Sequence, residues 1–177
     1  MELYVKEYQT LLLRENEKQN LVSRKTIDEE LEKHIADSLA LLSFVSWSGE
    51  RIVDIGSGAG FPGLLLSFAD LDNCFTLVES DLKKSGFLQQ CVQQLHLPHV
   101  QVVRERAEIL GQDPSYRETF TVCTSRAVSS IRVMVEYGLP LLKVGGSLYL
   151  WKGPKYQEEI DEAAHALYLL GAAVDNC

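Results

Sequence analysis

The sequence predicts an α/β fold, in which a mostly parallel, twisted sheet carries helices on both faces and is preceded by N-terminal helices. From Arg51 onward, short β-branched runs alternate with helical stretches, which is typical of parallel sheets with crossover helices. Before Arg51 the chain is charged and favours helix. A glycine-rich segment follows the first predicted strand directly, and open α/β sheets bind ligands beyond such strand ends.

The first 48 residues are predicted to form a helical extension. Apolar residues at helical spacing indicate an amphipathic helix over residues 1–20. The segment Thr26-Ile-Asp-Glu29 has the form of a capping box, which satisfies free amides at a helix start, so a second helix is predicted from there to about Phe44.

The α/β pattern fills the rest of the chain. Strands are predicted at 51–56, 74–79, 100–104, 120–125 and 146–151. Helices are predicted at 62–69, 81–95, 130–143 and 156–170. Because no repeat or linker interrupts the pattern, we expect a single domain over 1–177, with 1–48 as the extension and 49–177 as a cofactor-binding core.

Composition narrows the class of protein. The 177 residues are 46% hydrophobic and 24% charged, which is ordinary for one globular domain. We expect a cytoplasmic protein, because no apolar run approaches the roughly 18 residues that cross a bilayer. The four cysteines form no C-x-x-C pair, so neither a metal site nor a disulfide framework is predicted. The net charge of -8 argues against binding nucleic acid over the whole surface.

The glycine loop Asp54-Ile-Gly-Ser-Gly-Ala-Gly60 predicts a nucleoside cofactor. A dinucleotide pattern, G-x-G-x-x-G, fits Gly58, Gly60 and Gly63 only weakly, because it begins beyond the strand end. The tighter pattern starting at Asp54 lies on the strand itself, and it resembles the first motif of Rossmann-like class I methyltransferases. That resemblance implies S-adenosyl-L-methionine as the cofactor.

Glu79 ends the next predicted strand, 23 positions after Gly56. An acid about 20 residues beyond the loop commonly binds the ribose hydroxyls of a nucleoside cofactor. We therefore expect Glu79 to bind the cofactor, although an ordinary exposed carboxylate is the alternative. Ser80 is predicted to cap the helix over 81–95.

Beyond the loop, the sequence is similar to the RsmG (GidB) family over nearly its whole length. The matching motifs are Asn20-Leu-Val-Ser23, His34-Ile-Ala-Asp37-Ser38, Asp54-Ile-Gly-Ser-Gly-Ala-Gly-Phe-Pro-Gly63, Glu79-Ser80, Lys83-Lys84, Ser125-Arg126-Ala127 and Trp151-Lys152-Gly153. The resemblance implies methylation of a guanosine at ring nitrogen 7 in 16S ribosomal RNA of the small ribosomal subunit.

The resemblance also implies roles for individual residues. Gly56 and Phe61 would contact the cofactor, Ala107 and Glu108 would lie near its adenine, and Arg126 would close the site. Together with the loop and Glu79, the expected cofactor-binding residues are Asp54, Gly56, Gly58, Gly60, Phe61, Glu79, Ser80, Ala107, Glu108 and Arg126.

The chemistry of the substrate suggests which residues act in catalysis. Nitrogen 7 of guanine carries a lone pair and no proton, so its methylation needs positioning rather than a base. We expect Arg126 and Lys152 to orient the base or its phosphates, the alternative being surface ion pairs. His34 and Asp37 lie on or beside an apolar helical stripe and would either line the substrate cleft or form hydrogen-bonded core positions. Cys123 lies within an apolar strand and is interpreted as a packed thiol.

Several basic residues are candidates for binding RNA. If they gather at the mouth of the cleft, they would contact phosphates locally and make RNA affinity fall with salt. The candidates are Arg24, Lys25, Lys83, Lys84, Arg106 and Lys152.

The family pattern normally ends with two further strands, so a final antiparallel hairpin is expected to be missing from this chain. Two other functions remain open from the sequence. One is an NAD-dependent oxidoreductase on the same frame, and the other is a non-catalytic RNA-binding or ribosome-assembly protein, because fold alone does not fix function.

Overall fold

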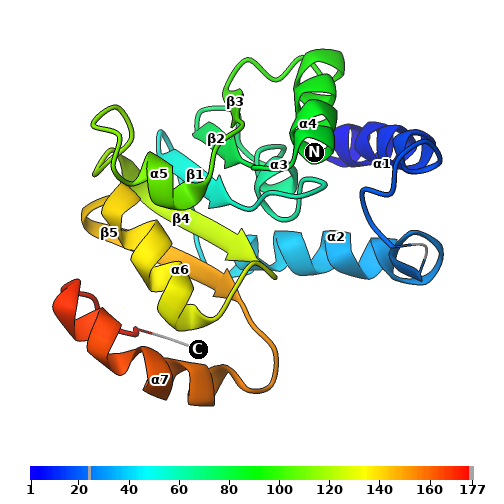
Figure 1. Ribbon diagram of the computed structural model, residues 1–177. Coiled ribbons are helices and arrows are strands. Elements are labelled where there is room, and N and C mark those ends of the chain that lie inside the picture. The colour runs from blue at the N-terminus through cyan, green and yellow to red at the C-terminus, as the bar shows by residue number, and fades with distance from the viewer. Residues whose placement is uncertain (24, 176–177) are drawn as a thin grey trace.

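The computed structural model describes residues 1–23 and 25–175, and Figure 1 shows them as a twisted sheet between helices. All strand pairs in the sheet are parallel, in the order β3-β2-β1-β4-β5. The strands are β1 (Arg51–Ile55), β2 (Cys74–Val78), β3 (Val100–Val103), β4 (Phe120–Arg126) and β5 (Leu142–Trp151). The predicted α/β class and mostly parallel sheet are confirmed.

Helices cover both faces of the sheet. One core joins the first four helices to one face, a second core joins α5 and α6 to the other, and α7 packs outside α6. The helices are α1 (Glu2–Asn16), α2 (Leu31–Leu39), α3 (Gly63–Leu66), α4 (Leu82–Gln94), α5 (Ala107–Leu110), α6 (Ile131–Gly138) and α7 (Tyr156–Leu169).

Strand β1 lies at the centre of the sheet, and its sequence explains why. Ile52 belongs to the core beneath α1 to α4, whereas Val53 belongs to the core beneath α5 and α6. Both side chains are fully buried. Strands that are covered on both faces read as continuous apolar runs rather than as an alternating pattern, and Ile52 to Ile55 is such a run apart from Asp54.

The strand order reverses between β1 and β4, and ligands of open α/β sheets bind outside the carboxyl ends at such a point. The glycine loop follows β1, Glu79 follows β2, and Arg126 ends β4. Figure 1 shows α2 running across this carboxyl edge, beyond the tip of β4. The topology therefore brings three of the predicted site segments to one edge of the sheet.

Several elements of the structure differ from the predicted ones. The helix predicted over 130–143 ends at Gly138, because Pro140 has no amide for a helical bond, and β5 already begins at Leu142. The second N-terminal helix is divided into a π-helical turn (Thr26–Glu30), α2 and a 3₁₀ turn (Ala40–Ser43). The four-residue helix α5 was not predicted.

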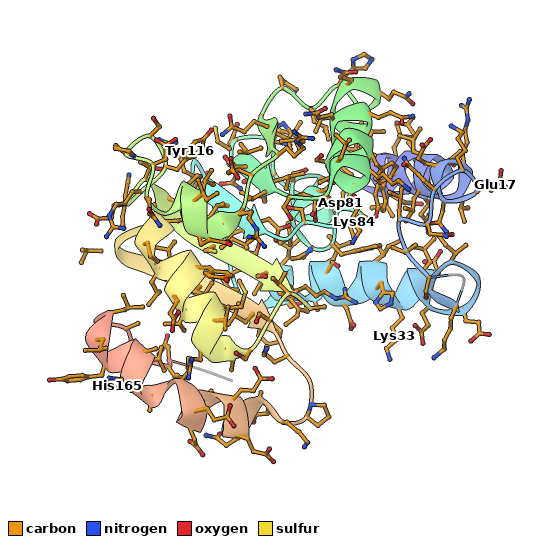
Figure 2. All side chains as sticks on the ribbon, in the orientation of Figure 1. Glu17, Lys33, Asp81, Lys84, Tyr116 and His165 are labelled. Atoms are coloured by element: carbon orange, nitrogen blue, oxygen red, sulfur yellow. The ribbon has the colours of Figure 1, made fainter. Side chains whose placement is uncertain are left out.

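The predicted cap of α4 is wrong by one residue. Asp81, not Ser80, accepts hydrogen bonds from the backbone amides of Lys83 and Lys84, and Ser80 is exposed. Figure 2 shows Asp81 and Lys84 together at the start of α4. The capping box predicted at Thr26 involves a side chain outside the described part of the chain. Among the described helices, none has the length and apolarity needed to span a bilayer.

Candidate active site at the carboxyl edge of the sheet

The glycine loop forms a tight backbone turn after β1. Gly56, Gly58 and Gly60 have φ values of 69°, 58° and 112°, a region that side chains disfavour. A Cβ on Gly56 would lie 2.3 Å from Val128 Cγ2, so the turn after β4 packs directly on the loop. Only glycine allows both this conformation and this close approach, which leaves a cradle lined by backbone.

Asp54 braces the loop from inside. Its carboxylate accepts hydrogen bonds from the Thr124 hydroxyl (2.7 Å) and the Gly63 amide (3.2 Å), and it is fully buried. Burial raises the pKa of the Asp54 carboxyl from 3.8 to about 6, although the hydrogen bonds from Thr124, Ser57 and Gly63 oppose this. Asp54, predicted to bind the cofactor, contacts the protein's own β4 and the start of α3.

Glu79 links the glycine loop to the start of α4. One carboxylate oxygen accepts from the Gly58 amide at 2.9 Å, and the other accepts from the Asp81 amide at 2.8 Å. Only 8% of the residue is exposed. Glu79 is therefore a buried carboxylate beside the glycine loop rather than an ordinary exposed one, and its binding of the cofactor stays a prediction.

Arg126 ties β4 to α2. Its Nη1 donates to the His34 carbonyl (3.0 Å) and to the Ser38 hydroxyl (3.2 Å), and its Nη2 contacts His34 Nδ1. Asp37 Oδ2 lies 4.0 Å from Nη2. The pKa of His34 is lowered, first by burial and then by the Arg126 charge, which favours the neutral imidazole, whose Nδ1 can accept from Arg126.

The Phe61 ring stands at the centre of this group. It lies 5.9 Å from the His34 ring and 5.8 Å from the Arg126 guanidinium carbon, a distance typical of cation–π contact. Residues from the glycine loop, from α2 and from β4, which were predicted separately to bind cofactor or substrate, thus converge on one cluster.

Two residues at the end of β5 hold other helices to the sheet. The Trp151 indole donates to the Asp37 carbonyl of α2 at 2.9 Å. Lys152 Nζ lies 2.6 Å from Glu159 Oε2 of α7 and donates to the Ser129 carbonyl at 2.7 Å. The ammonium of Lys152 is therefore engaged within the protein, and its pairing lowers the pKa of the Glu159 carboxyl.

The other predicted RNA-binding residues are distributed over separate elements. Lys25 pairs with Glu30 and Arg106 pairs with Glu108, each over a short stretch of chain. Lys83 is exposed at the start of α4 and Lys84 is half-buried there. Arg24 lies outside the described residues. Among the described contacts, Lys25 and Arg106 each pair with a nearby acid, and no contact links the basic candidates into one cluster.

The adenine positions predicted from the resemblance fall on α5, beyond the carboxyl end of β3. Ala107 is buried in the core beneath α5 and α6, and Glu108 is half-exposed in the first turn of that helix. Among the described residues, no group of three or more potential ligands could hold a metal ion.

Four residues of the site make contacts that the sequence did not indicate. Thr124 bonds Asp54, Val128 covers Gly56, Trp151 holds α2, and Tyr8 bonds the glycine loop from α1. Thr124 and Val128 flank the Ser125-Arg126-Ala127 motif, so that motif's neighbours were a usable signal. Tyr8 belongs to the apolar stripe of the helix predicted over residues 1–20, and nothing in that stripe indicates a hydrogen bond to the loop.

The parallel sheet and the backbone cradle define this protein as a Rossmann-like α/β protein with a candidate site for a nucleoside cofactor at the carboxyl edge of the sheet. A SAM-dependent methyltransferase from Aquifex aeolicus aligns with a TM-score of 0.62 at 20% identity, covering 86% of this chain and 88% of that chain. The geranyl diphosphate C-methyltransferase of Streptomyces coelicolor aligns with a TM-score of 0.60 at 16% identity, covering 85% and 58%. These similarities show the fold.

Sequence comparison gives the family. Residues 2–177 match the GidB family, described as rRNA small subunit methyltransferase G, and the chain belongs to this family. Ribosomal RNA small subunit methyltransferase G of Syntrophomonas wolfei is 49% identical over 98% of this chain and 81% of that protein. The corresponding protein of Desulfitobacterium hafniense is 46% identical over 94% and 69%. The predicted family, enzyme class and cofactor are confirmed, and the oxidoreductase alternative is not supported.

Proposed function

We propose that this protein transfers a methyl group from S-adenosylmethionine to ring nitrogen 7 of a guanosine in 16S ribosomal RNA of the small subunit. The observation that carries the proposal is the convergence of the glycine cradle, Glu79 and the Arg126 cluster at one edge of the sheet. Membership of the rRNA small subunit methyltransferase G family supports the class of substrate.

The residues present fit this cofactor. The loop backbone at Gly56 to Gly60 would approach its methionine part, and the Glu79 carboxylate would accept hydrogen bonds from its ribose hydroxyls. When bound, S-adenosylmethionine supplies a methyl group on a positively charged sulfur, and the lone pair of guanine nitrogen 7 takes that methyl without losing a proton. Ala107 and Glu108 of α5 are our candidates for the adenine side.

The side chains at the site suit a reaction of this kind. Cys123 is fully buried, and desolvation raises its pKa well above the ordinary thiol value, so it stays protonated and is a poor nucleophile. The His34 Nδ1 already contacts Arg126, so this nitrogen is not free to act as a base. A reaction governed by orientation needs neither a nucleophile nor a base from the protein.

Arg126 and Lys152 act mainly by positioning in this proposal. Arg126 holds α2 and Phe61 at the edge of the cradle, and Lys152 holds α7 to the turn after β4. His34 and Asp37 then line the substrate side of the cleft. Direct contact of these four residues with guanine or phosphate stays a prediction. Arg126→Ala tests the role of Arg126: the kcat at saturating cofactor should fall.

We further propose that the chain folds as one domain and acts in the cytoplasm, where its ribosomal substrate would be found. Tyr8 and Leu12 of the N-terminal extension share a hydrophobic core with Ile52 of the sheet, which supports a single unit. The basic candidates Lys83 and Lys84 would contact phosphates, so RNA affinity should fall steeply as salt rises.

The decisive experiment is transfer of labelled methyl groups to small ribosomal subunits from cells that lack the modification, followed by nucleoside analysis. We expect label in 7-methylguanosine of 16S RNA. Label in adenine or cytosine would contradict the substrate claim. Cofactor binding without any transfer would favour the non-catalytic assembly role.

Glu79→Gln provides the matched test of the cofactor site. Hydrogen bonds to a charged group contribute about 1.5–3 kcal/mol, so the Kd for S-adenosylhomocysteine should rise about tenfold or more. Glu118→Gln, whose side chain is 61% exposed away from these contacts, serves as the control and should leave binding unchanged. Equal affinities in the two variants would show that Glu79 does not bind the cofactor.

A further inference from the structure

Tyr8 is a buried polar residue that the proposed reaction does not use. It lies on α1 and is fully buried, yet its hydroxyl donates a hydrogen bond of 2.8 Å to the carbonyl of Ala59. Ala59 stands between Gly58 and Gly60 in the loop, 51 positions later in the chain. An N-terminal helix therefore bonds the backbone of the cofactor loop directly.

The ring of Tyr8 fits closely beneath the loop. Its centroid is 6.0 Å from that of Phe61, with the rings nearly perpendicular at 86°. A Cβ on Gly60 would lie 3.4 Å from Tyr8 Cε2 and 3.0 Å from Leu64 Cβ. The loop thus rests on Tyr8 with little space between them, and aromatic pairs in this edge-to-face geometry are favourable.

Two side chains bond neighbouring residues at the tip of the loop. Glu79 accepts from the Gly58 amide, and Tyr8 donates to the Ala59 carbonyl. Glu79 lies at the mouth of the cradle, where ribose hydroxyls would compete for its oxygens. Tyr8 has no exposed surface, so a bound cofactor would not compete for its hydroxyl.

Tyr8 also keeps its proton. Desolvation raises the pKa of its hydroxyl well above the ordinary value of 10.0, with Cys91 adding to the rise and Arg126 opposing it. Around neutral pH the hydroxyl is therefore always a donor. The carbonyl that it satisfies would otherwise be a buried acceptor without its partner, which is costly in a packed interior.

We propose that Tyr8 is a positioning residue for the cofactor: by fixing the Ala59 carbonyl it holds the glycine loop in its binding shape, which makes α1 a working part of the cofactor site. The inference rests on the proposed function, because the loop is taken to bind S-adenosylmethionine. It adds a residue of the N-terminal extension that does not touch the cofactor but controls its affinity.

Tyr8→Phe tests the proposal, because it removes the hydroxyl and keeps the ring that packs in the core. We expect the Kd for S-adenosylhomocysteine, measured by calorimetry, to rise about tenfold, which corresponds to about 1.4 kcal/mol. The KM for S-adenosylmethionine should rise in parallel. The kcat at saturating cofactor and the KM for the small subunit should stay within about twofold of wild type, because the hydroxyl acts on the loop alone.

Two control variants on α1 separate positioning from stability. Tyr4→Phe removes a hydroxyl from a tyrosine that stacks on Phe68, and Leu12→Ala opens a cavity one turn beyond Tyr8. Circular dichroism and thermal unfolding establish that each variant is folded. Leu12→Ala should lower Tm more than Tyr8→Phe does, yet both controls should bind S-adenosylhomocysteine with the wild-type Kd.

The outcomes divide cleanly. A wild-type Kd in Tyr8→Phe overturns the inference and leaves the proposed function intact. A rise in Kd in Leu12→Ala as large as that in Tyr8→Phe also overturns it, because loss of stability would then explain both. If wild-type protein bound no S-adenosylhomocysteine, the proposed function itself would fail, and the inference with it.

Discussion

Asp54→Asn is the most direct test of how the loop is built. The Asp54 carboxyl is fully buried between β1, β4 and α3, and it accepts from Thr124 and Gly63. An asparagine of the same shape can still accept from the Gly63 amide, while its own amide donates to the Thr124 hydroxyl. The substitution therefore removes the titratable group and preserves the packing and the number of hydrogen bonds.

The sign and size of the effect follow from the raised pKa. Because the pKa of Asp54 rises from 3.8 to about 6 on folding, the folded protein binds this proton more tightly than the unfolded chain does. Its contribution to stability is therefore greatest at low pH and is lost as pH rises through about 6. Relative to wild type, Asp54→Asn should gain about 2 kcal/mol in free energy of unfolding between about pH 4.5 and about pH 8.

Urea denaturation of both proteins across this pH range measures the difference directly. Other titrating groups are shared by the two proteins and cancel in the comparison, which isolates Asp54. A difference that does not change with pH would show that Asp54 titrates normally and would refute its description as a desolvated brace. A difference that falls with rising pH would show that folding lowers the pKa of Asp54 instead of raising it.

Two further predictions concern packing at named contacts. A Cβ on Gly63 would lie 2.4 Å from Asp54 Cβ, so Gly63→Ala should destabilise the protein by about 1–3 kcal/mol in urea denaturation. Gly86→Ala, in α4 with nothing within 4 Å, is its control and should stabilise by up to about 1 kcal/mol; a loss there too would void the comparison. Lys152→Ala and Glu159→Gln should each lower Tm by about 2–4 °C, and the double variant should lose less than the sum, because both variants remove the same Lys152–Glu159 ion pair; fully additive losses would mean independent roles.

The strands were predictable because their apolar, β-branched runs are local signals. β1 to β4 fall within a residue or two of the predicted ranges. The errors have local causes as well. Pro140 should have ended the predicted helix over 130–143, and Asp81 is as good a cap as Ser80, so the sequence alone did not choose between them.

The site was predicted less completely, because the roles of its residues depend on tertiary contacts. The motif around Asp54 marks a ligand loop, but nothing in it reveals that this carboxylate is buried against Thr124. Lys152 looked like a cation for RNA until its partners on α7 and in the turn after β4 were known. The sequence does not distinguish a basic side chain that faces solvent from one that pairs with an acid inside the protein.

The long span between the partners in the Arg126 cluster affects how the protein emerges from the ribosome. Arg126 is made 92 residues after His34, whose carbonyl it must bond. At about 5–20 residues per second, α2 waits about 5–18 s during synthesis before this partner exists. Over that interval the apolar face of the early helices has no completed sheet to cover, so nascent chains stalled before β4 should be the most dependent on chaperones and the most sensitive to protease.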